Sequence, residues 1–346
     1  MAAGTFFKTF TNSDRTTTRS LLHESIPITG TLVSGTYNTS STSGREENIK
    51  TFSHGMFQSI YDYPYLSSSA NHLFDITAGY SSASPLSGSG KEQNSKKINI
   101  YNQMAQGLVG YDTTNSIRDF DSDGNFSTTT ADKHQEVIFL NFSRLLVKDE
   151  IKKGSFSLTL GTSSAHASPF ADTLTLTDSH ATDGYKINSP AGEFGTLKKT
   201  GSETLYGLIY YQAGIVALAT GSFDAGVIDA GRNIEHALAS SSIDKISDGI
   251  RNRIQNVSFN NTTELNSTIY FCRANHNEFN YGSNPTYLNS GKIIVKNDDI
   301  LTPPRSYVTT VGLYSADNEL LAVAKLSEPL KKTPQNEVTL RVRLDY

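Results

Sequence analysis

The chain is poor in residues on which many secreted proteins and metalloproteins depend. Its 346 residues include no tryptophan and a single cysteine, Cys272, so an intrachain disulfide and a thiolate metal site are both excluded. Charged residues make up 18%, the formal net charge is -4, and no basic run marks a nucleic-acid-binding surface. Ser, Thr, Asn and Gly take the place of charge. This composition favours strands and turns, suits a protein buried in a large assembly, and predicts no nucleic-acid partner.

Long hydrophobic runs are also missing. The longest apolar stretch, Ala213–Ala219, is far shorter than the about 20 residues that a membrane-spanning helix needs. The N-terminal residues lack a charged segment followed by an apolar one, so we expect no signal peptide. These absences predict a protein that is made in a cytoplasm and has no membrane partner.

No catalytic motif stands out in the sequence. A phosphate-binding loop ending in Gly-Lys-Ser/Thr, a His-Glu-x-x-His motif and a Gly-x-Ser-x-Gly motif are all absent. The eight histidines lie singly, without the spacing of paired metal ligands. Carboxylates are plentiful, but sequence alone cannot pair them for acid–base chemistry. We therefore expect a protein that is not an enzyme.

The clearest positive signal is strict alternation of apolar and polar side chains. It runs without a break through Val338–Tyr346 and predicts a strand with one apolar and one wet face. Similar alternation over Phe156–Leu160, the apolar run Val137–Leu140 and a hairpin pattern over Leu205–Leu218 indicate further strands. Together they predict an α+β fold that is mainly β, with antiparallel sheets, a β-sandwich-like C-terminal part and a few short helices.

Apolar residues at helical spacing predict three of these helices. One covers Phe57, Ile60 and Tyr61 and ends before Pro64. A second lies around residues 100–108, and the clearest lies over residues 241–256. Gly249 is expected to weaken this last helix slightly, because glycine is a poor helix former.

Composition and pattern divide the chain into four parts. They are an extended N-terminal arm (1–45), a mixed helical and loop region (46–130), a central β-rich domain that includes the 241–256 helix (131–262) and a C-terminal antiparallel β domain (263–346). In the last part we expect strands near 266–274, 292–296, 306–314, 319–327 and 337–346, with Ser315–Asn318 as a hairpin turn. We expect the final strand to join the 306–314 and 319–327 strands in one sheet.

One segment has the pattern of a cation site. Asp119, Asp121 and Asp123 alternate and Gly124 follows at the sixth position, as in the first half of a calcium-binding loop. The twelfth position, where such a loop carries a bidentate glutamate, is Thr130. The three aspartates are therefore candidate calcium ligands, and calcium is the one cofactor we consider. The alternative is a polar turn in which the aspartates cap backbone N–H groups.

Nine segments share their pattern with one family. They are Tyr270–Ala274, Asn277–Tyr281, Ser283–Thr286, Tyr307–Tyr314, Glu319–Ser327 and Val338–Tyr346 in the C-terminal part, and Ser53–Asp62, Lys97–Met104 and Tyr210–Ile215 before it. The chain resembles a family of virion structural proteins from contractile-tailed phages, especially those that infect cyanobacteria and other marine bacteria. The resemblance spans most of the chain and brings no catalytic residue with it.

The resemblance implies a structural subunit of the virion tail, in the baseplate or the tail junction, assembled in the cytoplasm of the bacterial host. Its expected partners are tube, sheath or baseplate proteins and copies of itself. Phe279 and Tyr281 in a turn-rich loop, and Arg341 and Arg343 on the wet face of the last strand, are candidate partner contacts. Two alternatives remain open: a carbohydrate- or receptor-binding module of the virion, and a virion-associated hydrolase. The absence of tryptophan, a frequent sugar platform, speaks against the first.

Overall fold

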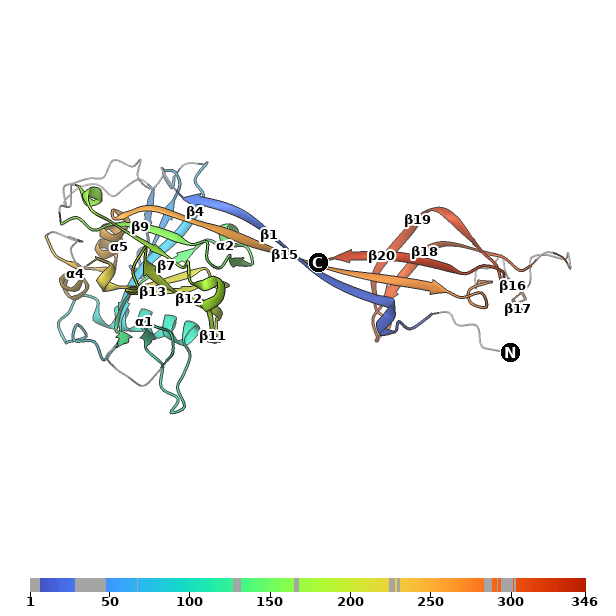
Figure 1. Ribbon diagram of the computed structural model, residues 1–346, viewed down its shortest axis with the longest axis horizontal. Helices are drawn as coiled ribbons and strands as arrows, with labels where there is room; N and C mark the ends of the chain where they lie inside the picture. Colours follow the sequence, from blue (N-terminus) through green and yellow to red (C-terminus); the bar gives the residue numbers. More distant parts are fainter. Residues whose placement is uncertain are drawn as a thin grey trace. The chain divides into compact units, whose positions relative to one another are not determined.

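The fold is mainly β, with antiparallel sheets and a few short helices, as the sequence predicts (Figure 1). The computed structural model describes residues 7–28, 48–66, 68–126, 132–164, 168–223, 228, 231–282, 288–290, 292–293, 301 and 303–346. The chain divides into two compact units. Unit 1 contains residues 1–21 and 264–346, and unit 2 contains residues 22–263.

The boundary between the two units, at 263/264, lies next to the predicted boundary at 262. Near residue 130 the structure has no division, because β4 (His72–Tyr80) pairs with β7 (Glu136–Phe142) in one sheet. In the predicted N-terminal arm, Arg15–Ile28 form strand β1, which pairs with β15 (Ile254–Ala274), while residues 29–45 lie outside the described residues.

Unit 2 is built on one antiparallel sheet with the strand order β15–β9–β10–β12–β13–β14–β7–β4–β3–β2. The other strands in this order are β2 (Ile49–Thr51), β3 (Gln58–Tyr61), β9 (Ser157–Gly161), β10 (Thr173–Thr177), β12 (Gly192–Lys199), β13 (Leu205–Tyr210) and β14 (Ile215–Ala219). Short strands β8 (Glu150–Ile151) and β11 (Lys186–Ser189) pair with β15 and β12, and β5 (Phe120–Asp121) pairs with β6 (Lys133–His134). The pair β13–β14 confirms the predicted hairpin.

The helices are short and lie almost entirely in unit 2. They are α1 (Asn94–Leu108), α2 (Arg144–Val147), α3 (Ala181–Gly184), α4 (Ile234–Ser240) and α5 (Ile243–Arg251), with 3-10 turns η1 (Asn12–Asp14), η3 (Pro169–Ala171) and η4 (Thr220–Phe223). Helices α1 and α5 confirm two predictions, although α5 ends before Ile254, which begins β15. Among the described residues, no helix is long and apolar enough to cross a membrane.

The predicted helix at residues 57–61 is wrong. Residues 58–61 form β3, in which Ile60 lies opposite Phe74 of β4 and is fully buried. Pairing of β3 with β4 on one side and β2 on the other therefore outweighs the local helical spacing, which is a weak preference.

The central strands of the unit 2 sheet, β13, β14 and β7, are buried on both faces, which explains their continuous apolar sequences. In β7, Ile138 and Leu140 belong to the larger hydrophobic core, which also takes most apolar side chains of α4 and α5. Val137 and Phe139 point the other way, into a smaller core that contains the apolar side chains of α1. A strand covered on both faces needs apolar residues at every position. Unit 2 therefore has a complete hydrophobic interior.

The described residues of unit 1 contain three separate sets of strands. Strand β20 (Val338–Asp345) pairs with β15, from Ser267 opposite Asp345 to Ala274 opposite Val338. Strands β18 (Ser306–Tyr314) and β19 (Leu320–Lys332) form a two-stranded sheet of their own. The remaining short pair is β16 (Leu288–Asn289) with β17 (Lys292–Ile293), and residues 294–296 of the predicted 292–296 strand lie outside the described residues.

The turn between β18 and β19 is confirmed, because the backbone N–H of Ser315 donates to the Glu319 carbonyl at 2.8 Å. Alternating exposure along β20 is confirmed as well. The expectation that the last strand joins the 306–314 and 319–327 strands in one sheet is wrong. Alternation decides which way side chains point, but it does not decide which strand lies alongside.

Candidate functional site

Unit 1 has almost no hydrophobic core. Among its described residues, the buried apolar side chains are Leu313 and Val342, and neither belongs to the two core clusters of the protein. Many more of its large apolar side chains are exposed: Phe7, Phe10, Leu21, Leu265, Tyr281, Leu301, Tyr307, Tyr314, Leu320, Leu321, Val323, Leu330 and Tyr346. Hydrophobic stabilisation grows with the apolar area removed from water, so unit 1 gains little of it.

The exposed apolar residues gather at the end of the β18–β19 hairpin. Tyr314 lies opposite Leu320, and Gly312 lies opposite Val323, so these side chains share one face. A Cβ atom at Gly312 would lie 2.9 Å from Cε2 of Tyr314 and 3.3 Å from Cδ1 of Leu320, so both side chains cover the glycine. Tyr314, Leu320, Leu321 and Val323 are 60%, 54%, 66% and 50% exposed, and we call these four residues the apolar tip.

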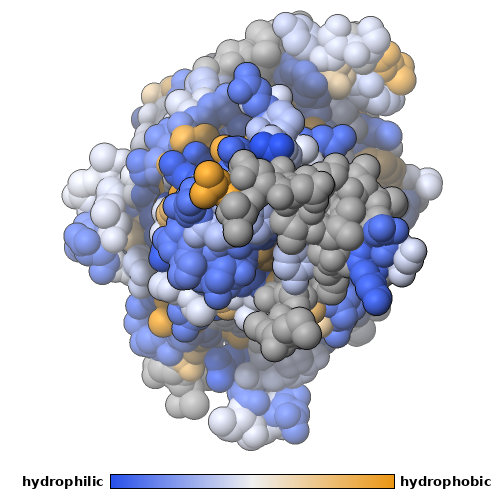
Figure 2. Space-filling view, turned by 90° about the vertical axis from the view of Figure 1, so that its right-hand side faces the viewer, coloured by the Kyte–Doolittle hydropathy of each residue, from blue (hydrophilic) through white to orange (hydrophobic). Residues whose placement is uncertain are grey.

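On the face drawn in Figure 2, apolar residues form small separate areas in a mostly hydrophilic surface. Single exposed apolar side chains are normal on a soluble protein, whereas adjacent ones mark a contact surface. The apolar tip is therefore a stronger candidate for a partner contact than single exposed apolar side chains are.

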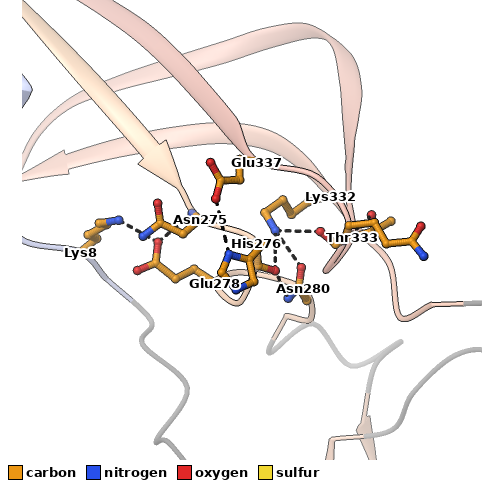
Figure 3. Close-up of polar contacts among 9 residues, drawn as sticks. Lys8, Asn275, His276, Glu278, Asn280, Lys332, Thr333 and Glu337 are labelled. Atoms are coloured by element: carbon orange, nitrogen blue, oxygen red, sulfur yellow. Dashed lines mark hydrogen bonds and ion pairs between the residues drawn. The ribbon is translucent and has the colours of Figure 1, made fainter.

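A buried lysine fixes the loop that follows β15 (Figure 3). Lys332 Nζ donates to the carbonyl oxygens of His276 and Thr333, at 3.2 and 3.0 Å, and to Asn280 Oδ1 at 2.8 Å. Burial lowers the pKa of Lys332. An ammonium group with three good acceptors ties this loop to the end of β19. The loop at residues 275–280 is therefore an ordered structure.

A second set of contacts holds the same loop from the other side. Glu278 Oε2 accepts hydrogen bonds from Lys8 Nζ at 2.8 Å and from the backbone N–H of Asn275 at 2.9 Å. These bonds, with that from Lys8 the stronger, hold the pKa of Glu278 below its usual value. Phe279 is half-buried and Tyr281 is 40% exposed on this loop. Both rings remain accessible, and their role as partner contacts stays a prediction.

The two candidate arginines on β20 differ in their surroundings. Both side chains are exposed. Arg343 donates from Nε to Asp345 Oδ1 at 2.7 Å and from Nη2 to Ser267 Oγ at 3.1 Å. Arg341 lies opposite Phe271 and has no such bond among the described residues. Arg341 is therefore the one of the two that can bind a partner without breaking a contact inside unit 1.

The aspartate-rich segment lies in unit 2. Carboxylate oxygens of Asp121, Asp123 and Asp132 all lie within 4.8 Å of one another, and we call these residues the acidic cluster. Asp121 is fully buried in β5 and forms an ion pair with Lys133. Asp123 Oδ1 accepts the backbone N–H of Asn125 at 2.9 Å, so the capping bonds of a polar turn are present too.

The acidic cluster differs from the predicted calcium ligands in one member. The carboxylate of Asp119 accepts a hydrogen bond from the Tyr101 hydroxyl at 3.1 Å and is not part of the cluster. Asp132 takes its place, because pairing of β5 with β6 returns the chain to Asp121. Thr130, the twelfth position of the predicted loop, lies outside the described residues. Spacing within one loop could not reveal Asp132, since the loop pattern ends before it.

Comparisons with protein-family models, with curated proteins and with solved structures find no match for this chain.

Proposed function

We propose that the protein is a non-enzymatic structural subunit that binds other subunits through unit 1, in the contractile tail of a phage virion. The observation that carries this proposal is the contrast between two buried and many exposed apolar side chains in unit 1. A domain of this kind loses chain entropy on folding and recovers little of it by burial. Contact with a neighbour would supply the missing burial. The sequence resemblance indicates the type of assembly.

Strand edges in unit 1 support the same proposal. The two-stranded sheet β18–β19 has no further strand on either side among the described residues. Unpaired edges carry free N–H and C=O groups that readily pair with another chain. An open strand edge beside an exposed apolar surface promotes aggregation of an isolated protein. In an assembly, one neighbouring subunit can cover both.

The apolar tip exposes enough side-chain surface for its burial to contribute to partner binding. Full burial of a Leu, Val or aromatic side chain contributes about 1.5–3 kcal/mol. The four tip residues are half to two-thirds exposed. Covering them would therefore contribute roughly 1 kcal/mol or more each. Repeated in symmetric copies, such contacts are enough to order an assembly.

The proposal is tested by supplying variants during growth of a phage that lacks this gene and measuring the protein in purified virions. We expect the wild-type chain in virions by mass spectrometry, in several copies per particle. The double variant Leu320→Ser and Val323→Ser should be incorporated at least about tenfold less, because it removes apolar area from the contact.

A matched control removes apolar surface elsewhere. Leu66 and Ile187 in unit 2 are 85% and 74% exposed, and their double serine variant should be incorporated like wild type. Absence of the wild-type protein from virions would refute the structural role. Normal incorporation of the tip variant would instead refute only the role of the tip.

A further inference from the structure

The two outer edges of the β18–β19 sheet differ in their protection against pairing with a further strand. Strand β19 carries Lys325, Glu328 and Pro329, and a bulge between Lys325 and Leu330 interrupts its pairing with β18. Charged residues, proline and bulges are the features by which edge strands avoid other chains. Strand β18 has the sequence Ser-Tyr-Val-Thr-Thr-Val-Gly-Leu-Tyr, with no charged residue and no proline. The edge of β18 is therefore the unprotected one.

The middle of β18, Tyr307–Val311, is open to solvent, and we call it the β18 edge. None of its side chains is buried, whereas Ser306 before it is buried and donates to the Phe279 carbonyl. Among the described residues, β18 pairs with β19 and with no other strand. An isolated two-stranded sheet is marginally stable in water, and further strands stabilise it. The β18 edge is therefore the place where another strand adds to this sheet.

The chemistry of the β18 edge narrows the choice of partner. A charged strand would have to desolvate its charges beside an uncharged one, which costs free energy because no opposite charge is there to pair with them. Among the described edge strands longer than two residues, β1, β2, β11, β19 and β20 each carry charge, and β18 carries none. The strand of this chain that matches the β18 edge is therefore β18 itself, in a second copy.

We propose that two copies of the chain pair through their β18 edges, antiparallel about a twofold axis at Thr309, in one sheet with the order β19–β18–β18–β19. In this register Thr309 lies opposite Thr309 of the second copy, and Tyr307 lies opposite Val311 of the second copy. Threonine pairs, and aromatic side chains opposite β-branched ones, stabilise antiparallel sheets. A twofold contact is closed, so it gives dimers and not fibres. The inference rests on the proposed function, because it names one partner of unit 1.

Charge substitutions at Thr309 test this pairing in the purified full chain by analytical ultracentrifugation. We expect the wild type to dimerise reversibly at micromolar concentrations. Thr309→Lys and Thr309→Glu should each weaken dimerisation at least about tenfold, because like charges directly opposite each other destabilise a strand pair. An equimolar mixture of the two variants should dimerise again, because opposite charges then meet. Recovery of this kind is specific to contact between two copies of the same strand.

The matched control places a charge on the protected edge. Ser327 is exposed on β19, so Ser327→Lys should dimerise like wild type. A wild type that stays monomeric at about 0.1 mM, where even weak specific contacts form, would overturn the proposal. A dimer that neither substitution at Thr309 weakens, or a mixture that does not recover, would overturn it as well.

A disulfide between copies keeps the test decisive if a charged variant does not fold. Cys272 is the single cysteine, so Thr309→Cys in a Cys272→Ser background has one thiol. Opposite residues of an antiparallel pair have Cα atoms about 4.5–5.5 Å apart, and a disulfide spans about 4.4–6.8 Å. Mild oxidation should therefore give a covalent dimer with Thr309→Cys and not with Ser327→Cys. Equal cross-linking of both variants, or none with Thr309→Cys, would contradict the pairing.

The outcome in virions is independent of the outcome in solution. A chain that is monomeric in solution and still enters virions would overturn the pairing of two β18 edges alone. A chain that dimerises through Thr309 and is absent from virions would overturn the structural role alone.

Discussion

Replacing Lys97 by methionine is expected to lower the free energy of unfolding of unit 2 by about 3 kcal/mol. Lys97 is fully buried in α1, and its Nζ donates to the carbonyl oxygens of Glu92, Leu238 and Ser241 at 2.7–2.8 Å. These bonds join α1 to Leu238 near the end of α4 and to Ser241, which directly follows α4. Methionine fills similar volume but leaves three carbonyls without a donor, and each buried unsatisfied group costs about 1–3 kcal/mol.

The same variant should change the pH dependence of stability. Burial lowers the pKa of Lys97 to about 8, from 10.5 in the unfolded chain. Between these values the unfolded chain binds more protons, so the contribution of Lys97 to the unfolding free energy rises with pH. The deficit of Lys97→Met relative to wild type should therefore grow by about 1–2 kcal/mol between pH 7.5 and 9.5.

Denaturant unfolding at pH 7.5 and 9.5, followed by circular dichroism, measures the stability deficit of Lys97→Met relative to wild type. Lys96→Met is the matched control, because Lys96 is exposed and donates to one carbonyl, that of His54 at 2.7 Å. It should cost less than about 1 kcal/mol at either pH. A deficit of Lys97→Met that stays constant with pH would contradict the lowered pKa of the buried Lys97.

Replacing Gly249 by alanine should destabilise unit 2 by about 2 kcal/mol, although alanine favours helices by about 1 kcal/mol. In α5, an added Cβ atom would lie 2.1 Å from the carbonyl oxygen of Ile228 and 2.7 Å from its Cγ2. The Ile228 backbone cannot yield easily, because its N–H donates to the Arg232 carbonyl at 2.8 Å. The steric cost therefore exceeds the gain in helix propensity.

Gly107 in α1 provides a control with the same chemistry. A Cβ atom there meets nothing within 4 Å, so Gly107→Ala should stabilise the protein by about 0.5–1 kcal/mol. Thermal and denaturant unfolding of both variants measure whether each is less or more stable than wild type. If Gly249→Ala stabilised the protein like Gly107→Ala, the close approach of α5 to Ile228 would be disproved.

Several elements could be predicted from the sequence because their signal is local. Alternation over Val338–Asp345 shows which side chains share a face, and the spacing of Ile100, Met104 and Leu108 shows the buried side of α1. Asp121 and Asp123 could be named as possible ligands for the same reason. Their neighbours in the sequence already form the turn.

Other features depend on segments that are distant in the sequence. Residues 58–61 are a strand because β4 is there to pair with them, and Asp132 reaches Asp121 because β5 and β6 pair. Gly249 looks like a weak point of a helix until the position of Ile228 is known. Lys97 has the pattern of an ordinary helix residue, and only the approach of α4 and α5 buries it.

Sequence alone determined the mainly β character of this protein, the directions of side chains along its strands and the low charge of its surface. These follow from periodicity and composition, which are properties of neighbouring residues. Only the tertiary structure decided that the last strand pairs with β15, that the described residues of unit 1 bury few apolar side chains and that three carboxylates meet. Burial and proximity are properties of the whole folded chain, because each depends on which distant segments come into contact.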